Sequence, residues 1–236
     1  MYIKNGFLHY EDSYLQKRKK KITGHSFVAL AGLDIYNKPG DAVLSMLKIY
    51  SSEVDPKYLA RGNYAEKMVG LVLKSQGKEV TYYDEQYKKA HYYDCFPRYN
   101  SLGGIPDFEI FKESLTVEVK SKSMKKYEEI KSEIPISELY QGLFYCYLRE
   151  HRDLKMAYVF FDEETENQIF NKQIPTTLNN CKLLFKKYTC NREELKQLID
   201  KAIMYYNICI ANKSIPVKDI SPKVLNALQL DSRDDV

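Results

Sequence analysis

The chain has 236 residues, of which 44% are hydrophobic and 29% are charged. This composition excludes a disordered or collagen-like chain. The length is sufficient for a hydrophobic core that needs no disulfides or metals to stabilise it. The 36 basic residues outnumber the 32 acidic ones only slightly, which excludes a histone-like protein and permits a nucleic-acid partner without demanding one.

The first part of the chain is predicted to be helical. A basic run over residues 14–23 leads into a short apolar helix over residues 27–32. A Pro-Gly turn then makes Asp41 the expected N-cap of a helix over residues 41–50.

A longer helix is predicted to begin at Asp55-Pro56, with Asp55 as cap and Pro56 at the first helical position, and to stop at Gly77. Its apolar face is predicted to carry Leu59, Met68, Val69 and Val72.

Beyond that helix the sequence favours strands. They are predicted at residues 79–83, 91–96, 107–111, 114–120, 156–161 and 168–171. A helix over residues 137–150, capped by Ser137, divides them. The remainder is predicted to be helical, with Asn191 opening a long amphipathic helix to about residue 211, and the tail from residue 221 is expected to fray. This order predicts an α/β fold in which helices flank a mixed central sheet.

Candidate catalytic residues cluster in the predicted strand over residues 114–120. Apolar side chains alternate there with polar ones, and this places Glu118 and Lys120 side by side on the face opposite Leu115, Val117 and Val119. An alternative interpretation is a solvated ion pair, because Glu-x-Lys tripeptides are common in strands. The Pro-Asp dipeptide ahead of this strand favours the functional interpretation.

Asp107 joins this pair if Lys112-Glu113 forms a two-residue hairpin loop, since Asp107 then lies opposite Glu118. A bulge or a longer loop would shift this register by one residue. Directly opposed carboxylates repel each other, and a divalent cation between them removes the repulsion. Oxygen ligands suit Mg²⁺ or Mn²⁺, which would activate water against a phosphodiester. Lys120 would contact the scissile phosphate or position the water.

Two helices supply further candidates. Gln141 and Tyr145, four residues apart, share one helical face, and Gly62, Glu66 and Gly70 share a face of the earlier helix. Glycines beside an acidic residue are consistent with close approach of another backbone or a substrate. The alternative is tight helix packing with Glu66 exposed.

Together these residues resemble a known nuclease family. The resemblance is carried by Glu66, Pro106-Asp107, Glu118-Val119-Lys120, Gln141 and Tyr145, and more weakly by Arg18 before Ile22-Thr23 and by Gly62 before Glu66. This set resembles the PD-(D/E)xK nuclease superfamily in its QxxxY branch, and best the phage lambda-type exonucleases. The resemblance implies a restriction-endonuclease-like core over about residues 18–161 within a single nuclease domain, residues 1–236, whose C-terminal helical part covers about residues 176–220.

The resemblance also implies roles for single residues. Asp107 and Glu118 would be metal ligands, aided by the Val119 carbonyl, with Glu66 as a further candidate ligand. Lys120 would be the catalytic lysine.

The remaining roles concern the substrate. Gln141 and Tyr145 would orient the site and the DNA backbone, while Arg18 would bind a terminal 5′-phosphate, with His25 and Ser26 in the same substrate-binding set. The family continues Ile-Thr-Ala-Ser, whereas this chain reads Ile-Thr-Gly-His-Ser, so its serine is displaced by one position and the details of that pocket stay open.

The function implied is a metal-dependent, 5′–3′ DNA exonuclease that works from duplex ends in phage-type recombination or end resection. A homotrimer and a single-strand annealing protein are the implied partners. Two alternatives remain: an endonuclease of the same superfamily, of restriction or defence type, and a non-catalytic DNA-binding module on a nuclease fold. The longest apolar run, residues 27–33, is far short of the ~20 residues that span a bilayer, and the first residues lack the apolar stretch of a secretory signal. We therefore expect a location in the cytoplasm of a bacterial or phage-infected cell, without a membrane partner.

The cysteines argue against disulfides or a structural metal site as stabilisers of the fold. They are odd in number, form no CxxC pair and are scattered as Cys95, Cys146, Cys181, Cys190 and Cys209. We expect neither a disulfide framework nor a zinc site. Some QxxxY nucleases bind an iron–sulfur cluster through four cysteines, but the C-terminal spacing here is too loose, so no cluster is expected.

Overall fold

The computed structural model describes residues 1–51, 55–83, 86–87, 90, 100–172, 181–228 and 230. The predicted strand at residues 91–96 and Cys95 lie outside these ranges. Within them, no helix has both the length and the apolar character needed to cross a bilayer.

The elements follow one another in mixed order along the chain. The helices are α1 (Asp12–Lys17), α2 (Gly24–Leu30), α3 (Pro39–Met46), α4 (Pro56–Ser75), α6 (Tyr127–Ser132), α7 (Ile136–Leu148), α8 (Glu163–Phe170), α9 (Arg192–Asn212) and α10 (Pro222–Ala227). The strands are β1 (Tyr2–Lys4), β2 (Phe7–His9), β3 (Thr81–Tyr82), β4 (Phe108–Ile110), β5 (Leu115–Ser123), β6 (Asp153–Phe161), β7 (Cys181–Thr189) and β8 (Ser214–Pro216).

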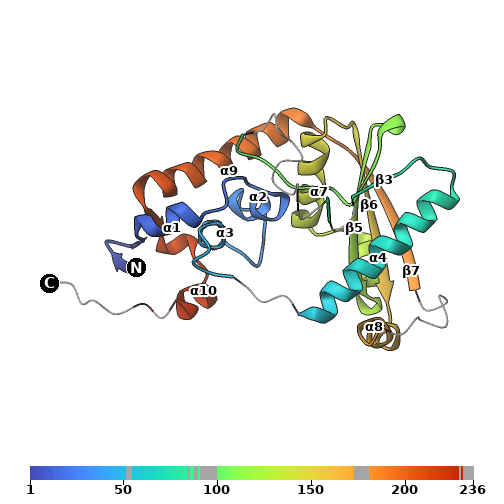
Figure 1. Ribbon diagram of the computed structural model, residues 1–236, viewed down its shortest axis with the longest axis horizontal. Helices are drawn as coiled ribbons and strands as arrows, with labels where there is room; N and C mark the ends of the chain where they lie inside the picture. Colours follow the sequence, from blue (N-terminus) through green and yellow to red (C-terminus); the bar gives the residue numbers. More distant parts are fainter. Residues whose placement is uncertain are drawn as a thin grey trace.

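A five-stranded sheet in the order β3-β4-β5-β6-β7 forms the centre of one half of the molecule. Only the β5–β6 pair is parallel, so the sheet is mixed. Helices α4 and α8 cover one face and α7 covers the other, as Figure 1 shows. Val69 and Leu73 of α4 pack with Val117 of β5 on the first face, while Phe144 of α7 packs with Met156 of β6 on the second. The α/β fold with a mixed, helix-flanked sheet is confirmed.

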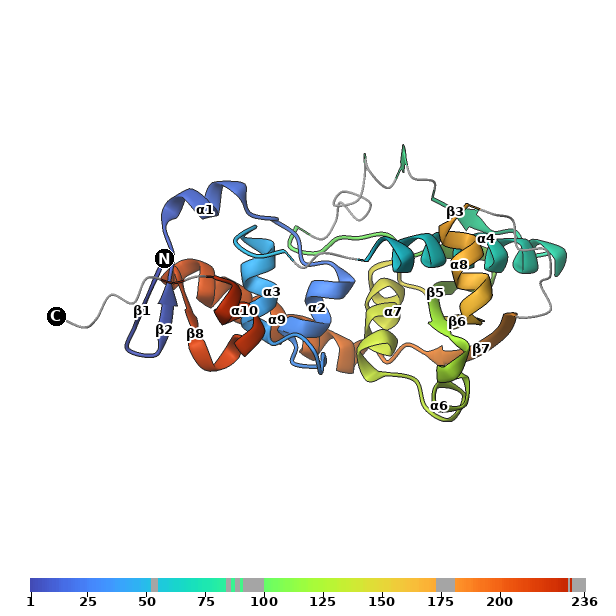
Figure 2. The same cartoon turned by 90° about the horizontal axis from the view of Figure 1, so that it is seen from below.

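The other half is built from helices and a small sheet of distant segments. Strand β2 pairs with β1 and with β8, so residues near both ends of the chain share one sheet. Helix α9 extends from this sheet past α2 and α3 to α7 (Figure 2). These three strands were not predicted from the sequence, because each has only three residues.

Two helix starts follow the predicted capping chemistry. Asp55 accepts a hydrogen bond from the Lys57 amide at 2.8 Å, and α4 begins at the next residue, Pro56. Asn191 accepts one from the Glu194 amide at 3.3 Å and opens α9. Both predictions are confirmed, because a cap depends only on neighbours within one helical turn.

Two other predicted caps are wrong. Helix α3 begins at Pro39, and Asp41 lies inside its first turn, where the carboxylate accepts from the amides of Lys38 at 3.0 Å and Ser221 at 2.9 Å. Helix α7 begins directly after Pro135, so Ser137 also lies within the first turn. In α3, proline opens the helix before the expected polar residue, because its fixed φ already suits the first helical position, whereas in α7 proline is itself the N-cap.

Two elements of the C-terminal part differ from the prediction. The predicted strand at residues 168–171 belongs largely to α8, which Asp162 caps by accepting from the Thr165 amide at 2.8 Å. Acidic residues in the first turn favour this helix through its dipole. Conversely, residues 181–189, expected to be helical, form β7 at the edge of the sheet. Lysines on an edge strand prevent further pairing and weaken the alternation that identifies a strand.

The buried face of α4 also differs from the prediction. Val69 is buried, but Leu59 is 60% exposed, and the other buried residues of the helix are Ala65, Gly70 and Leu73. A Cβ at Gly70 would lie 3.2 Å from the Phe108 ring, so this glycine allows close helix–sheet packing, whereas Gly62 faces open space.

These glycines permit a paired stability test. A Cβ at Gly40 would lie 2.5 Å from the Asp219 carbonyl oxygen and 2.8 Å from the Ile215 side chain. Gly40→Ala is therefore expected to lower the free energy of unfolding by about 2 kcal/mol. Gly62→Ala, in a helix interior with no atom within 4 Å of the new Cβ, should raise it by roughly 0.5–1 kcal/mol. Urea unfolding of both variants checks the pair, and equal effects would contradict the packing of α3 on the C-terminal segment.

Candidate active site

The β4–β5 hairpin sets the geometry of the candidate site. Phe108 pairs with Val117 and Ile110 with Leu115, which is the predicted register. The connection is longer than the predicted two-residue loop: a 3-10 turn over Phe111–Glu113 is followed by Ser114 with φ of 50°. The longer loop takes the same number of residues from the end of β4 as from the start of β5, so the pairing of the two strands keeps the predicted register.

Asp107 lies just before β4 and is fixed by β5. Its Oδ2 atom accepts a hydrogen bond from the Val119 amide at 2.7 Å. Continuing the observed register places Asp107 opposite Glu118, as predicted. Asp107 is thus attached to the backbone of β5 directly next to Glu118.

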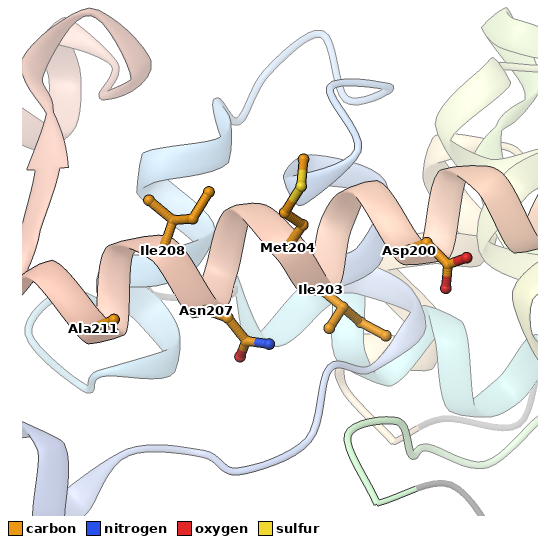
Figure 3. Close-up of a pocket in the computed structure, with 6 residues that line it drawn as sticks. All are labelled: Asp200, Ile203, Met204, Asn207, Ile208 and Ala211. Atoms are coloured by element: carbon orange, nitrogen blue, oxygen red, sulfur yellow. The ribbon is translucent and has the colours of Figure 1, made fainter.

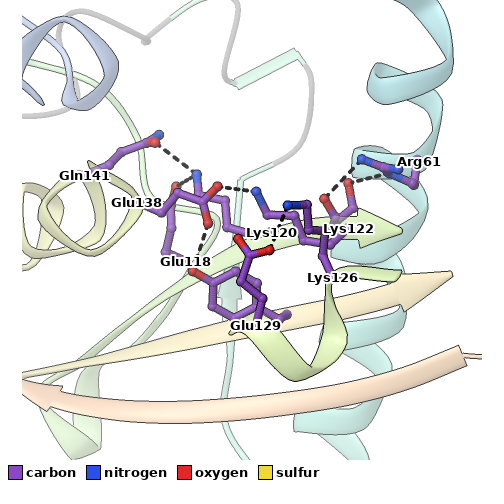
Figure 4. Close-up of polar contacts among 10 residues, drawn as sticks. Arg61, Glu118, Lys120, Lys122, Lys126, Glu129, Glu138 and Gln141 are labelled. Carbon is purple, nitrogen blue, oxygen red and sulfur yellow. Dashed lines mark hydrogen bonds and ion pairs between the residues drawn. The ribbon is translucent and has the colours of Figure 1, made fainter. Parts of the chain in front are cut away.

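Glu118 and Lys120 project from β5 toward α7. The Lys120 ammonium donates to Glu118 Oε1 at 2.9 Å and to Gln141 Oε1 of α7 at 3.0 Å (Figure 4). Glu118 is 4% exposed. Its second oxygen, Oε2, is buried and has no hydrogen-bond partner in the described part of the chain, a costly state for a carboxylate.

The electrostatics of the site reflect two close carboxylates. Burial raises the pKa of Asp107 well above its usual value, and the negative charges of Glu118 and Glu66 add to this, against Lys120 and the Val119 amide. Burial alone would lower the pKa of Lys120, but the charges of Glu118 and Asp107 outweigh it and raise this pKa above the ordinary value. The two carboxylates thus favour the charged form of Lys120, while burial and their mutual repulsion favour the neutral form of Asp107.

The donor set fits a hard divalent cation. Asp107 and Glu118 offer carboxylate oxygens, one of them the unpartnered Glu118 Oε2, and such oxygens suit Mg²⁺ or Mn²⁺. Val119 engages its amide with Asp107, and its carbonyl remains the predicted third donor. Among the described residues, no three His, Cys, Asp or Glu side chains form a group that could hold a metal ion. Glu66 acts on Asp107 through its charge, and its role as a further ligand stays a prediction.

Tyr145 packs between two glycines beside the site. It is 4% exposed. A Cβ at Gly24 would lie 2.9 Å from its Cζ atom, and one at Gly104, where φ is +113°, would lie 2.8 Å from its Cε1 atom. These glycines therefore let α2 and the segment before Asp107 close on the ring from two sides.

A backbone bridge joins the same two segments. The Ile22 amide donates to the Ser101 carbonyl at 2.8 Å, and the Gly103 amide donates to the Ile22 carbonyl at 2.9 Å, in a parallel bridge between Ile22 and Leu102. The N-terminal segment is thereby attached to the stretch that leads into Asp107.

The three predicted substrate-binding residues lie in different surroundings. His25 is an exposed residue at the start of α2. Nearby protein atoms lower its pKa, as do the charges of Lys120 and Lys19, against Asp34, so it lies within electrostatic range of the candidate catalytic lysine.

Ser26 and Arg18 are engaged elsewhere. The Ser26 hydroxyl accepts from the Thr23 amide at 2.9 Å and donates to the Thr23 carbonyl at 3.1 Å, closing the first turn of α2. This explains the displaced serine as a capping residue. Arg18 donates to the Leu15 carbonyl at 2.7 Å, and its charge acts on the Tyr206 hydroxyl of α9.

Several polar residues around the site were not predicted from the sequence. The structure adds Lys122, Glu138, Tyr158, and an arginine, Arg61, that donates to the Ser121 carbonyl at 3.3 Å and to Glu166 at 2.7 Å. The signal for Lys122 was present, since the alternation that selects Glu118 and Lys120 continues to it.

A separate hollow lies along α9. It is lined by Asp200, Ile203, Met204, Asn207, Ile208 and Ala211 (Figure 3). All six residues come from α9, so this surface is distinct from the carboxylate site on β5.

Solved structures with a similar fold are exonucleases by name. A phage-related exonuclease from Haemophilus somnus 129PT has a TM-score of 0.58 at 16% identity, over 85% of this chain and 99% of that one. An alkaline exonuclease from Laribacter hongkongensis has a TM-score of 0.55 at 12% identity, over 86% and 94% of the chains. The chain has the fold of these exonucleases. The Laribacter enzyme in complex with dAMP gives a TM-score of 0.54 at 13% identity, over 86% and 95% of the chains. No family model and no curated protein matches the sequence.

Charge repulsion within the site gives a stability prediction. Asp107→Asn is expected to raise the free energy of unfolding of the metal-free protein by roughly 1 kcal/mol, since it removes one of two opposed charges and one pKa unit corresponds to about 1.4 kcal/mol. The Asn side-chain oxygen can still accept from Val119. Urea unfolding in EDTA measures the effect. The matched control is Glu128→Gln, an exposed side chain at 78%, which should change stability little; a less stable Asp107→Asn protein would contradict the repulsion.

Proposed function

We propose that this protein is a metal-dependent DNA exonuclease that hydrolyses phosphodiester bonds from duplex ends, acting in phage-type recombination or end resection. The observation that carries the proposal is the convergence of Asp107, Glu118 and Lys120, with the buried Glu118 Oε2 left without a partner. The shared fold with proteins named exonucleases supports it, as does the complex of one of them with dAMP.

The residues divide the chemistry between them. Asp107 and Glu118 would hold Mg²⁺ or Mn²⁺, with the Val119 carbonyl as a further donor. The bound ion supplies Lewis-acid chemistry at the phosphate and lowers the pKa of water. Lys120 stabilises the negative charge that develops on the phosphate oxygens, because its raised pKa keeps it charged and its ammonium is held in place before substrate arrives.

Gln141 and Tyr145 would orient the site and the DNA backbone, Gln141 through its contact with this lysine. Gln141 accepts a hydrogen bond from Lys120, which restricts the ammonium to the space between β5 and α7. Tyr145 lies one turn further along α7, and its ring is packed against the backbone at Gly24 and Gly104. Holding a charged group before reaction avoids reorganisation during the chemical step.

The first test concerns Lys120. Lys120→Ala should lower turnover on linear duplex DNA with Mg²⁺ by two orders of magnitude or more, while DNA affinity changes little, because phosphate contacts are shared among many cations. Lys126→Ala is the control, since this exposed lysine pairs with Glu129 at 2.7 Å outside the site. Equal losses in both variants would reduce Lys120 to part of a general basic surface.

The same assay tests the exonuclease proposal with wild-type protein. Linear duplex should be degraded, and covalently closed circular duplex should stay intact. Cleavage of the closed circle would favour the endonuclease alternative, and DNA binding without cleavage of either substrate would favour the non-catalytic module.

The second test concerns the terminal phosphate. A guanidinium can donate two parallel hydrogen bonds to a phosphate, so if Arg18 recognises the 5′ end, wild type should degrade 5′-phosphorylated duplex faster than 5′-hydroxyl duplex. Arg18→Ala should then abolish the preference without changing Mg²⁺ binding. If Arg18→Ala keeps the preference and only loses stability, its role is the observed contact with the Leu15 carbonyl.

A further inference from the structure

A polar contact next to the candidate site joins three elements. The Lys122 ammonium donates to Glu138 Oε1, and the Tyr158 hydroxyl donates to Glu138 Oε2 at 2.9 Å. These residues come from β5, the first turn of α7 and β6, respectively. Figure 4 shows the Lys122–Glu138 contact beside the Lys120–Gln141 contact. Both oxygens of one carboxylate are thus used to hold α7 to two strands.

The surroundings make this contact costly to break. The side chains of Lys122 and Glu138 are 25% and 18% exposed, and Tyr158 is fully buried. Burial, with the charge of Glu138, raises the pKa of Tyr158 far above its ordinary value, so the phenol stays a hydrogen-bond donor. Removing the carboxylate would leave a largely buried ammonium and a buried hydroxyl without their acceptor.

Two neighbouring contacts join β5 to α7: Lys120–Gln141 and Lys122–Glu138. We call this pair of contacts the ladder and each contact a rung. Lys120 and Lys122 are two residues apart on β5, about 6.6 Å along a strand. Their acceptors Gln141 and Glu138 are three residues apart on α7, about 4.5 Å along a helix. Lysine side chains can span this difference, so each rung attaches one turn of α7 to β5.

The ladder connects Glu138 to the catalytic lysine. In the parallel register, Tyr158 lies beside Lys120 on the neighbouring strand, and Gln141 lies one turn after Glu138 on the same helix. A displacement of the first turn of α7 would therefore move the acceptor of the Lys120 ammonium. A misplacement of about 1 Å at a reacting group can cost about 100-fold in rate.

We propose that Glu138, held by Lys122 and Tyr158, is a positioning residue for the reaction: it fixes α7 so that Gln141 keeps the Lys120 ammonium at the scissile phosphate. This proposal rests on the proposed nuclease function.

The experiment compares kcat and KM on linear duplex with Mg²⁺. Glu138→Gln should lower kcat roughly 10- to 100-fold and leave KM for DNA unchanged. Lys122→Met should give the same loss, because it removes the same rung, and Lys122→Arg should restore most of kcat by keeping the ion pair. The matched control is Glu129→Gln, which breaks the exposed Lys126–Glu129 pair outside the site and should leave kcat unchanged.

Two outcomes would overturn the proposal. If Lys122→Met raises KM while kcat is kept, Lys122 is a direct contact to the DNA backbone. If Glu138→Gln and Glu129→Gln have equal kcat, the ladder does not position Lys120.

A readout without substrate separates this proposal from the proposed function. Amide hydrogen exchange of the folded, metal-free protein should become faster in the first two turns of α7 in Glu138→Gln, with exchange in α9 unchanged. A wild-type protein that cleaves no DNA would overturn the nuclease proposal, and the exchange measurement would still decide whether Glu138 fixes α7. Unchanged exchange would refute the positioning role.

Discussion

The hydrogen bond from the Val119 amide to Asp107 is the constraint on which the candidate site depends. It fixes an acidic side chain at the start of one strand against the backbone of its neighbour, at 2.7 Å. The alternation of β5 then places Glu118 and Lys120 on the same side as the helix α7. A shift of the hairpin by one residue would turn these two side chains to the opposite face, so the register of a short hairpin determines whether the site exists.

Charge explains why this arrangement suits a cation. Burial and neighbouring carboxylates raise the pKa of Asp107, and the nearby ammonium of Lys120 does not fully offset them. The protein uses the same ammonium to hold Glu118 and Gln141. Folding has therefore been achieved despite a local repulsion, a cost that is typical of sites whose residues are arranged for a ligand.

Local sequence patterns predicted that Asp107, Glu118 and Lys120 lie together. Contacts between distant segments could not be predicted from such patterns. The hairpin register and the caps at Asp55 and Asn191 follow from neighbours within a few residues, so the sequence was sufficient for them. The contact of Glu138 with β5 and β6 requires knowing that α7 crosses both strands, which no local spacing states. For the same reason the pairing of β2 with β8 was missed. The roles of the site residues in catalysis remain predictions.

The backbone bridge between Ile22 and Leu102 has a consequence for the order of folding. Its two segments are about 80 positions apart, so closing the loop between them costs chain entropy before any contact compensates for it. Contacts of such high sequence separation slow folding. The attachment of the N-terminal segment to residues 101–103 is therefore expected to form later than the local β4–β5 hairpin. A partly folded chain can thus bring Asp107 and Glu118 together in the hairpin before the N-terminal segment is attached beside them.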